Sequence, residues 1–328
     1  MKSKIIALGH MAGEDIVTND YFVKKGLDTS DQWIKERTGI KTRHFVKPET
    51  ASSDLGYMAA KMCLDNANRL ATDIDLIITA TSTPDYISFP STACLIQKKL
   101  GCSTIPAFDI SAACSGFCYA LTTADAFIQS KKFKRILVIG VDCLSTITNM
   151  NDRGTCILFG DAAGAALLES SEDETSGIIS SSIQADGNLS DILIVPKGGS
   201  KYPFNSNVAN EALHYIKMDG STVFKQAIKI VVSEIKKALS ELNLKTEDVD
   251  YLVCHQANQR ILDKITEHLN MPKEKCLTNI HNYGNTSAAS IPLVLSEFNK
   301  DKGFKKGDLL ILAGFGAGFT WGISIIRW

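Results

Sequence analysis

The stretch Asp109-Ile110-Ser111-Ala112-Ala113-Cys114-Ser115-Gly116 joins a strand-like run to the start of a probable helix. In the second half of the chain, Gly284-Asn285-Thr286-Ser287-Ala288-Ala289-Ser290 also opens a helix and is equally rich in small residues. In each half a further strand follows, and then a glycine-rich turn, at residues 159–166 and 315–320, that leads into another strand. Because the same parts recur in the same order, the sequence predicts a duplicated fold.

Short β-branched runs alternate with amphipathic helices along the whole chain, which is the pattern of an α/β protein with buried sheets. The clearest predicted strands are residues 76–80, 136–141 and 309–313, and the clearest predicted helices are residues 54–69, 116–130, 225–242, 259–269 and 291–299. Any α/β protein alternates strands and helices, but the matched glycine-rich turns favour a duplication. We therefore expect two halves, residues 1–173 and 174–328, that place Cys114 and Asn285 at equivalent helix starts beside one cleft.

The composition is that of a soluble globular protein. The chain has 328 residues, of which 45% are apolar and 22% are charged, and its formal net charge is −1. A nearly neutral molecule has no strong attraction for nucleic acid or an anionic membrane surface, so we expect neither as a partner. Any basic docking patch must be local.

The cysteines indicate a reducing compartment. They are odd in number, form no Cys-x-x-Cys pair and mostly lie in apolar runs, which is typical of buried thiols and not of a disulfide framework. The apolar part of the N-terminal segment is too short for a signal peptide, and no apolar run reaches membrane-spanning length. We expect a cytoplasmic enzyme.

Cys114 is the candidate nucleophile. It follows a strand-like segment and lies at a probable helix start, where the helix dipole and free N–H groups favour a thiolate. Its small neighbours leave room for a thioester to approach the sulfur. The alternative is an inert buried cysteine, which fits most of the other eight.

His255 and Asn285 are the candidate partners of this thiol. His255 directly follows a predicted strand, at the end where α/β proteins bind ligands. Taken singly, His255 fits a structural histidine and Asn285 a turn or helix-cap asparagine. On matching ends of a duplicated fold, they make a nucleophile with two hydrogen-bonding partners. The glycine-rich residues 314–322 precede a strand and open no helix, so we reject a dinucleotide site there and expect backbone N–H groups that face a ligand oxygen.

Together these motifs resemble those of β-ketoacyl-acyl-carrier-protein synthase III, in the right order and over nearly the whole chain. The Asn partner separates this type from the elongating synthases, which use a second His, and from thiolases, which use a second Cys. The similar blocks are Ala113-Cys114-Ser115-Gly116-Phe117, His255-Gln256-Ala257-Asn258, residues 284–290, Asp28-Thr29-Ser30-Asp31-Gln32-Trp33-Ile34 with Arg37-Thr38-Gly39-Ile40, Asp152-Arg153-Gly154-Thr155 with Phe159-Gly160-Asp161, and the C-terminal glycine block. The resemblance implies a thiolase-like, duplicated five-layered αβαβα fold and a homodimer.

The resemblance also implies the reaction, a decarboxylative Claisen condensation of a short acyl-CoA, with acetyl-CoA favoured, and malonyl-ACP. The product is 3-oxoacyl-ACP, which initiates fatty acid synthesis, and no cofactor or metal takes part. Cys114 would carry the acyl group, and the N–H groups of Cys114 and Ala317 would form the oxyanion hole. His255 and Asn285 would stabilise the enolate that forms when malonyl-ACP loses CO₂.

The binding residues are carried over in the same way. Trp33 and Arg153 would sandwich the CoA adenine, and Arg37 would meet the CoA phosphates. The residues expected to line the pantetheine tunnel are Thr29, Gly220, Phe224, Ala257 and Asn258. Phe89 would reach into the partner subunit's acyl pocket, and Lys225 and Arg260 would dock the carrier protein.

Two differences from the family pattern bear on these expectations. Glu267 and His268 stand where a pair of basic residues is common, which weakens the carrier-docking patch. Ala317 replaces a common Gly but keeps the backbone N–H that an oxyanion hole needs.

Two other functions remain open at this point. A secondary-pathway paralogue that condenses a larger or aromatic acyl-CoA would carry the same core motifs, and the loop at residues 197–210 does not decide between them. A non-catalytic acyl- or carrier-binding scaffold predicts loss of the nucleophile, yet Cys114, His255 and Asn285 are all present. A papain-like protease, which also uses Cys, His and Asn, would lack the duplicated architecture.

Overall fold

A computed structural model describes residues 2–203 and 211–328. Part of the loop predicted at residues 197–210 therefore lies outside the described residues. The strands are β1 Lys2–Ala12, β2 Asp15–Thr18, β3 Thr42–Phe45, β4 Leu76–Ala80, β5 Ala107–Ile110, β6 Arg135–Cys143, β7 Asp161–Ser171, β8 Gly177–Ala185, β9 Leu193–Ile194, β10 Lys217–Met218, β11 Tyr251–Cys254, β12 Leu309–Gly316 and β13 Thr320–Arg327. The α-helices are α1 Asp20–Lys24, α2 Asp31–Thr38, α3 Ser52–Ala67, α4 Thr92–Leu100, α5 Gly116–Gln129, α6 Arg153–Cys156, α7 Gly220–Glu241, α8 Gln259–His268, α9 Ile280–Tyr283 and α10 Ser290–Asp301.

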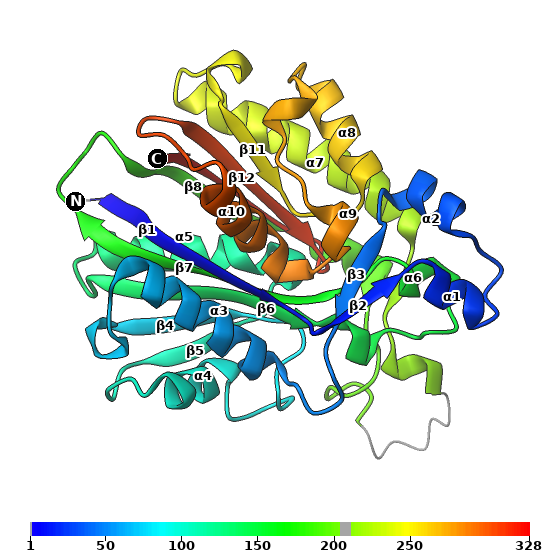
Figure 1. The fold of residues 1–328 in the computed structure, drawn as a ribbon. Helices are drawn as coiled ribbons and strands as arrows, with labels where there is room; N and C mark the ends of the chain where they lie inside the picture. The colour runs from blue at the N-terminus through cyan, green and yellow to red at the C-terminus, as the bar shows by residue number, and fades with distance from the viewer. Residues whose placement is uncertain (1, 204–210) are drawn as a thin grey trace.

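The first half is built on a five-stranded sheet with the order β1-β7-β6-β4-β5. β4 pairs in parallel with β5 and β6, and β7 pairs antiparallel with β1 and β6. Every residue of β4 is buried, which is why this strand is a continuous apolar run in the sequence. Helices α3 and α4 cover the outer face of the sheet (Figure 1).

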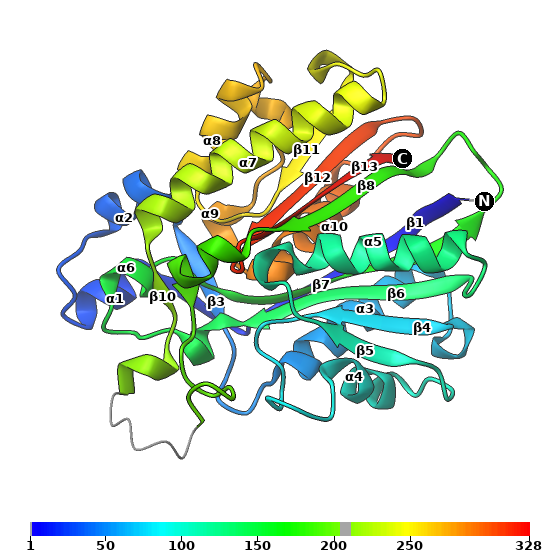
Figure 2. The ribbon, with the colours of Figure 1, turned by 180° about the vertical axis from the view of Figure 1, so that it is seen from behind.

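The second half repeats this plan with a four-stranded sheet of order β11-β12-β13-β8. A single parallel bridge between Leu252 and Cys276 stands where a fifth strand would pair with β11. Helices α7 and α8 cover the outer face of this sheet (Figure 2). The apolar stripe of α7, at Ala227, Val231 and Ile235, is fully buried against it.

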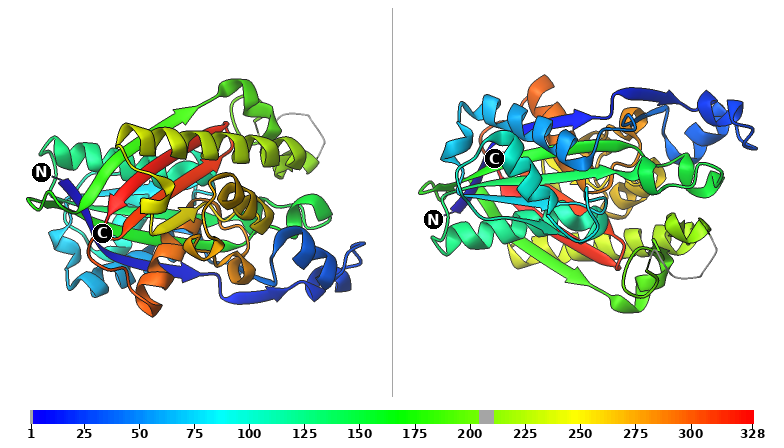
Figure 3. Two further views of the ribbon diagram at one scale, coloured as in Figure 1. Left: turned by 90° about the horizontal axis from the view of Figure 1, so that it is seen from above. Right: turned by 90° about the horizontal axis from the view of Figure 1, so that it is seen from below.

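The two sheets enclose an inner layer formed by α5 and α10, which completes five layers in the order helix, sheet, helix, sheet, helix. Seen from above and below, the outer helices lie in front of their own sheets (Figure 3). The order β1-α3-β4-α4-β5-α5-β6-β7 is matched by β8-α7-β11-α8-bridge-α10-β12-β13. The predicted duplicated five-layered fold is therefore confirmed. We propose residues 173 and 174 as the boundary between the halves, because they lie in the connection from β7 to β8.

Backbone angles align the two inner helix starts residue by residue. Ala113 and Ser287 are each the first residue of a short 3-10 turn, before α5 and α10 respectively, and both have positive φ, at 46° and 49°. The position equivalent to Cys114 is therefore Ala288, and Asn285 lies three residues before it. The predicted equivalence holds for the two helix starts and not for the two residues.

The inner helix starts meet the opposite half at backbone contact distance. A Cβ on Gly140 of β6 would lie 2.2 Å from the carbonyl oxygen of Ala288, and one on Gly160 would lie 2.2 Å from the carbonyl oxygen of Tyr283. Real Cβ atoms do not approach a backbone oxygen so closely, so glycine is required at both positions. This contact seats the segment that carries Asn285 against the first half.

No helix in the described part of the chain is both long and apolar enough to cross a membrane.

We predict that Gly140→Ala lowers the free energy of unfolding by about 1–3 kcal/mol, because the new methyl group must push the Ala288 backbone aside. Denaturant unfolding of the purified variant measures this change. Gly187→Ala is the matched control, since a Cβ at Gly187 meets nothing within 4 Å. Equal stability of the two variants would contradict the tight contact.

Candidate active site

A cavity of about 130 Å³ lies between the two halves, and Cys114, His255 and Asn285 all line it. Cys114 lies in the 3-10 turn before α5, His255 directly follows β11, and Asn285 follows α9. One half therefore supplies the thiol and the other supplies the imidazole and the amide.

Burial decides the protonation of the thiol. Burial raises the pKa of Cys114 to about 12, a hydrogen bond from the Ser287 side chain opposes the rise, and the buried carboxylate of Asp142 adds to it. With this pKa the thiol stays protonated near neutral pH, which opposes the expectation that the helix start favours the thiolate. Burial and the helix start act on the pKa of this thiol in opposite directions.

His255 is neutral for the same reason. Its side chain is buried, and burial lowers its pKa to about 3. The Nδ1 atom lies 2.8 Å from the hydroxyl oxygen of Ser290, and the ring of Phe315 packs against the imidazole with centroids 5.1 Å apart. A neutral imidazole can act as a hydrogen-bond donor without carrying charge into the cavity.

Asn285 is held by bonds to both halves. Its N–H donates to the carbonyl of Leu158 at 2.8 Å, and its own carbonyl accepts from the N–H of Gly160 at 2.9 Å. The side-chain Oδ1 accepts from the N–H of Ser287 at 3.0 Å. With Oδ1 engaged in this bond, the amide Nδ2 is the group left to donate to a ligand.

A second, apolar cavity of about 90 Å³ also has Cys114 in its wall. Ala317, at the turn after β12, belongs to this cavity as well. Its apolar lining consists of Ala113, Leu144, Ile147, Phe159, Leu193, Ile194, Val195 and Ile216. Cys114 is therefore common to two cavities, one that it shares with His255 and Asn285 and one that it shares with Ala317 and mainly aliphatic side chains.

Two backbone N–H groups beside the thiol are free to bind a ligand. Within residues 2–203 and 211–328, neither the N–H of Cys114 nor that of Ala317 has a hydrogen-bond acceptor. Gly316 packs against Cys114, and a Cβ there would lie 2.6 Å from the Cys114 nitrogen. Because Gly316 has no side chain, the turn after β12 can approach Cys114 closely.

The residues predicted for the CoA head group lie together on the surface. The guanidinium carbons of Arg153 and Arg37 lie 4.9 Å and 5.8 Å from the ring centroid of Trp33. Arg153 also pairs with the carboxylate of Asp28 at 3.3 Å. The hydroxyl of Thr29 is buried without a hydrogen-bond partner among the described residues.

The predicted tunnel residues line the 130 Å³ cavity with the reactive groups: Gly220, Phe224, Ala257 and Asn258. Arg260 stacks over Phe224 at 5.6 Å, and Lys225 is exposed one residue further along α7. The structure does not bring Phe89 to either cavity of its own chain, and its side chain is 83% exposed.

Sequence reasoning gave no role to four residues that shape the site. Phe159 lines both cavities, Ser287 and Ser290 contact the reactive side chains, and Asp142 lies buried beside Cys114. Ser287 and Ser290 belong to the small-residue stretch at residues 284–290, and their hydroxyl groups are the only sign in the sequence that they could contact a ligand or a reactive side chain. Nothing local marks Asp142, which is brought to the site by the pairing of β6 with β4.

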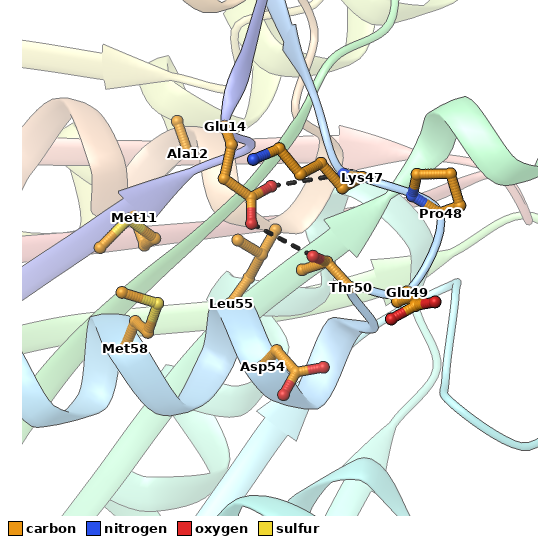
Figure 4. Close-up of a pocket in the computed structure, with 10 residues that line it drawn as sticks. All are labelled: Met11, Ala12, Glu14, Lys47, Pro48, Glu49, Thr50, Asp54, Leu55 and Met58. Atoms are coloured by element: carbon orange, nitrogen blue, oxygen red, sulfur yellow. Dashed lines mark hydrogen bonds between the residues drawn. The ribbon is translucent and has the colours of Figure 1, made fainter.

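A larger surface cavity of about 670 Å³ lies far from this chemistry, between the end of β1 and α3 (Figure 4). Its Glu14 carboxylate accepts from the N–H of Lys47 at 3.3 Å and from the hydroxyl of Thr50 at 3.2 Å. The cavity has no Cys or His in its wall, so we place the candidate active site at Cys114. No group of three or more His, Cys, Asp or Glu in the described residues is arranged to hold a metal ion.

We predict that alkylation of Cys114 by iodoacetamide speeds up about tenfold per pH unit from about pH 6.5 to 9.5, without a plateau, because the thiolate fraction grows throughout this range. Peptide mass mapping measures the rate at Cys114, and Cys114→Ala assigns the peptide. A plateau above about pH 7 would show that the helix start outweighs burial.

The comparisons with known proteins agree with this arrangement. Family models described as "3-Oxoacyl-[acyl-carrier-protein (ACP)] synthase III" and its C-terminal part match residues 108–187 and 239–328. The chain is 46% identical to "Beta-ketoacyl-[acyl-carrier-protein] synthase III" of Natranaerobius thermophilus over 99% of both chains. It is 44% identical to the protein of the same name from Syntrophomonas wolfei, over 100% of this chain and 98% of the relative.

A solved structure shows the same likeness in three dimensions. The crystal structure of 3-oxoacyl-[acyl-carrier-protein] synthase III from Aquifex aeolicus VF5 superimposes with a TM-score of 0.91 and 43% identity, over 99% of this chain and 100% of that one. Identity at this level over the full length is well above what a shared fold alone requires. The chain belongs to the β-ketoacyl-acyl-carrier-protein synthase III family.

Proposed function

We propose that this protein joins a short acyl-CoA, with acetyl-CoA favoured, to malonyl-ACP and releases CO₂ and 3-oxoacyl-ACP, the first condensation of fatty acid synthesis. The observation that carries the proposal is the position of Cys114 in the wall of two cavities, one that it shares with His255 and Asn285 and one that is lined mainly by aliphatic side chains. The cavity with His255 and Asn285 suits the reacting thioester groups, and the aliphatic cavity suits the acyl chain that is bound to the sulfur.

In the first half-reaction, Cys114 attacks the thioester carbonyl of the acyl-CoA. A new S–C bond forms at Cys114, the bond to the CoA sulfur breaks, and the thiol proton leaves with CoA. The free N–H groups of Cys114 and Ala317 would bind the oxyanion. One such donor in a preorganised site contributes roughly 3–4 kcal/mol.

In the second half-reaction, malonyl-ACP loses CO₂ and the electron pair moves into an enolate. His255 and the Nδ2 of Asn285 would donate to the enolate oxygen, since both are neutral donors beside the thiol. The enolate carbon then attacks the acyl carbonyl on Cys114, a C–C bond forms, the bond between that carbonyl and the Cys114 sulfur breaks, and the sulfur takes up a proton from water to become a thiol again. Loss of CO₂ generates the carbanion, so no strong base is required.

The small apolar cavity supports a short primer. A volume of about 90 Å³ holds only a few water-sized groups, which suits an acetyl group better than a long or aromatic acyl group. The cavity shares Ser82, Ile147 and Val195 with a surface depression of about 730 Å³. An acyl chain too long for the small cavity would extend into this surface depression.

CoA binding rests on the cluster around Trp33. For the adenine to lie between Trp33 and Arg153, the guanidinium must first leave the ring that it now covers. Arg37 would meet the phosphates, and the unpartnered hydroxyl of Thr29 is available to the ligand. Gly220, Phe224, Ala257 and Asn258 would line the path of the pantetheine arm.

A homodimer would complete the site. β5 lies at the edge of its sheet, and the segment after β4 exposes Tyr86, Ile87 and Phe89 at 56%, 61% and 83%. An open strand edge beside exposed large apolar side chains is typical of an interface. Phe89 would then reach the acyl cavity of the partner. The nine free thiols support a cytoplasmic location.

The test of the proposed function is a mass measurement of the intact protein after incubation with acyl-CoAs from acetyl to octanoyl and with one aromatic thioester. We expect fast acetylation in the native protein and none in Cys114→Ala. Preference for the long or aromatic groups would favour the secondary-pathway alternative. No adduct from any thioester would contradict an acyl-enzyme.

Carrier docking by Lys225 and Arg260 has a separate test. We expect Arg260→Glu to raise KM for malonyl-ACP by about tenfold at low salt, because a charge at the rim mainly steers association. Lys236→Glu, at an exposed position further along α7, is the matched control. The rate of acylation by acetyl-CoA, measured in the same variants, shows whether the cavity itself is damaged. An unchanged rate assigns the change in KM to carrier docking. Equal KM values in the two variants would exclude Arg260 from the docking surface.

A further inference from the structure

Ser290 is the first residue of α10 and is 1% exposed, so its hydroxyl has no access to bulk water. The oxygen lies 2.8 Å from Nδ1 of His255 and accepts the N–H of Gln256 at 3.3 Å. Residues 255 and 290 come from different elements, the end of β11 and the start of α10. Their contact therefore depends on how the inner helix is seated against the second sheet.

The hydrogen bonds around Ser290 determine which ring nitrogen of His255 carries the proton. A buried hydroxyl needs an acceptor for its own proton. Among the described residues, the acceptor within reach of the Ser290 hydroxyl is Nδ1 of His255, since no carbonyl takes this proton. The Nδ1 atom is then the acceptor, and the proton of the neutral ring is on Nε2.

We propose that Ser290 is a positioning residue that holds His255 in the Nε2–H form, so that the ring donates to the substrate oxygen as the enolate develops. This inference rests on the proposed function for its chemical consequence. It assigns to Ser290 a role that the sequence pattern of small residues does not show.

The tautomer divides the two half-reactions. In acylation, the proton of Cys114 leaves on the CoA sulfur, so His255 neither gains nor loses a proton. In decarboxylation, the bond to the carboxylate carbon breaks, and its electrons build charge on the thioester oxygen that Nε2–H faces. A ring with the proton on Nδ1 would present a lone pair to that oxygen and would repel it.

The chain contains a matched control for this contact. Ser296, also buried on α10, lies 2.8 Å from Nδ1 of His10. His10 belongs to β1 and lines neither cavity at Cys114. Ser296→Ala therefore removes the same kind of serine–histidine bond from the same helix, away from the reacting groups.

The direct test is nitrogen NMR of the full-length protein with ¹⁵N-labelled histidine, with the His255 signals assigned from His255→Ala. We expect Nε2 of His255 to be protonated in the native protein. We expect Ser290→Ala to show both tautomers or a mobile ring, and Ser296→Ala to keep the native His255 signals. A native His255 with its proton on Nδ1 overturns the proposal without any variant.

Kinetics give the second arm of the test. We expect Ser290→Ala to slow CO₂ release from malonyl-ACP by about tenfold or more, up to the roughly 10²–10³-fold loss that follows removal of a whole donor. Acetylation of Cys114 should stay within about twofold of the native rate. Unchanged CO₂ release together with unchanged His255 signals overturns the proposal. If the native protein releases no CO₂, the proposed function fails, and the NMR result still decides the tautomer.

Discussion

The site depends on one contact between the halves, in which the backbone of Asn285 is bonded on both sides by the first half. Its N–H reaches the carbonyl of Leu158, and its carbonyl receives the N–H of Gly160. Because main-chain hydrogen bonds are short and directional, this pairing holds the Asn285 segment of the second half against the first half. Gly140 and Gly160 allow the approach by presenting no side chain. The thiol, the imidazole and the amide share a cavity as a consequence.

The same closure sets the electrostatics of the site. Burial leaves Cys114 as a thiol and His255 as a neutral ring. Charge therefore appears only when substrate arrives, first on the oxyanion and then on the enolate. Neutral donors that are already in place stabilise such charge without reorganising. The fold supplies these donors from a turn, a strand end and a helix start.

Much of this arrangement could be predicted from the sequence. The strand at residues 76–80 was predicted with its bounds, and the helices α3, α5, α7, α8 and α10 were predicted to within a few residues except for the first turn of α7, because long amphipathic and apolar runs are strong local signals. Two helix starts rich in small residues predicted the duplicated fold. They also predicted that Cys114, His255 and Asn285 lie at one cavity.

The remaining features depend on burial and on contacts between distant residues. A helix start is visible in the sequence, but the depth to which Cys114 is buried is not, and burial determines its pKa. The bond between Ser290 and His255 joins residues on separate elements, so no local pattern marks it. The stacking of Arg153 on Trp33 likewise involves α6 and α2, which only the fold brings together.

The central claim is that an acyl group held on Cys114 is the one that enters the product. A single-turnover chase tests it most directly: the protein is acetylated with labelled acetyl-CoA, freed of excess reagent and mixed with malonyl-ACP. We expect the label to leave Cys114 and to appear in 3-oxoacyl-ACP, with one CO₂ released for each label transferred. Label that stays on the protein while product forms, or that leaves as free acetate, would contradict it.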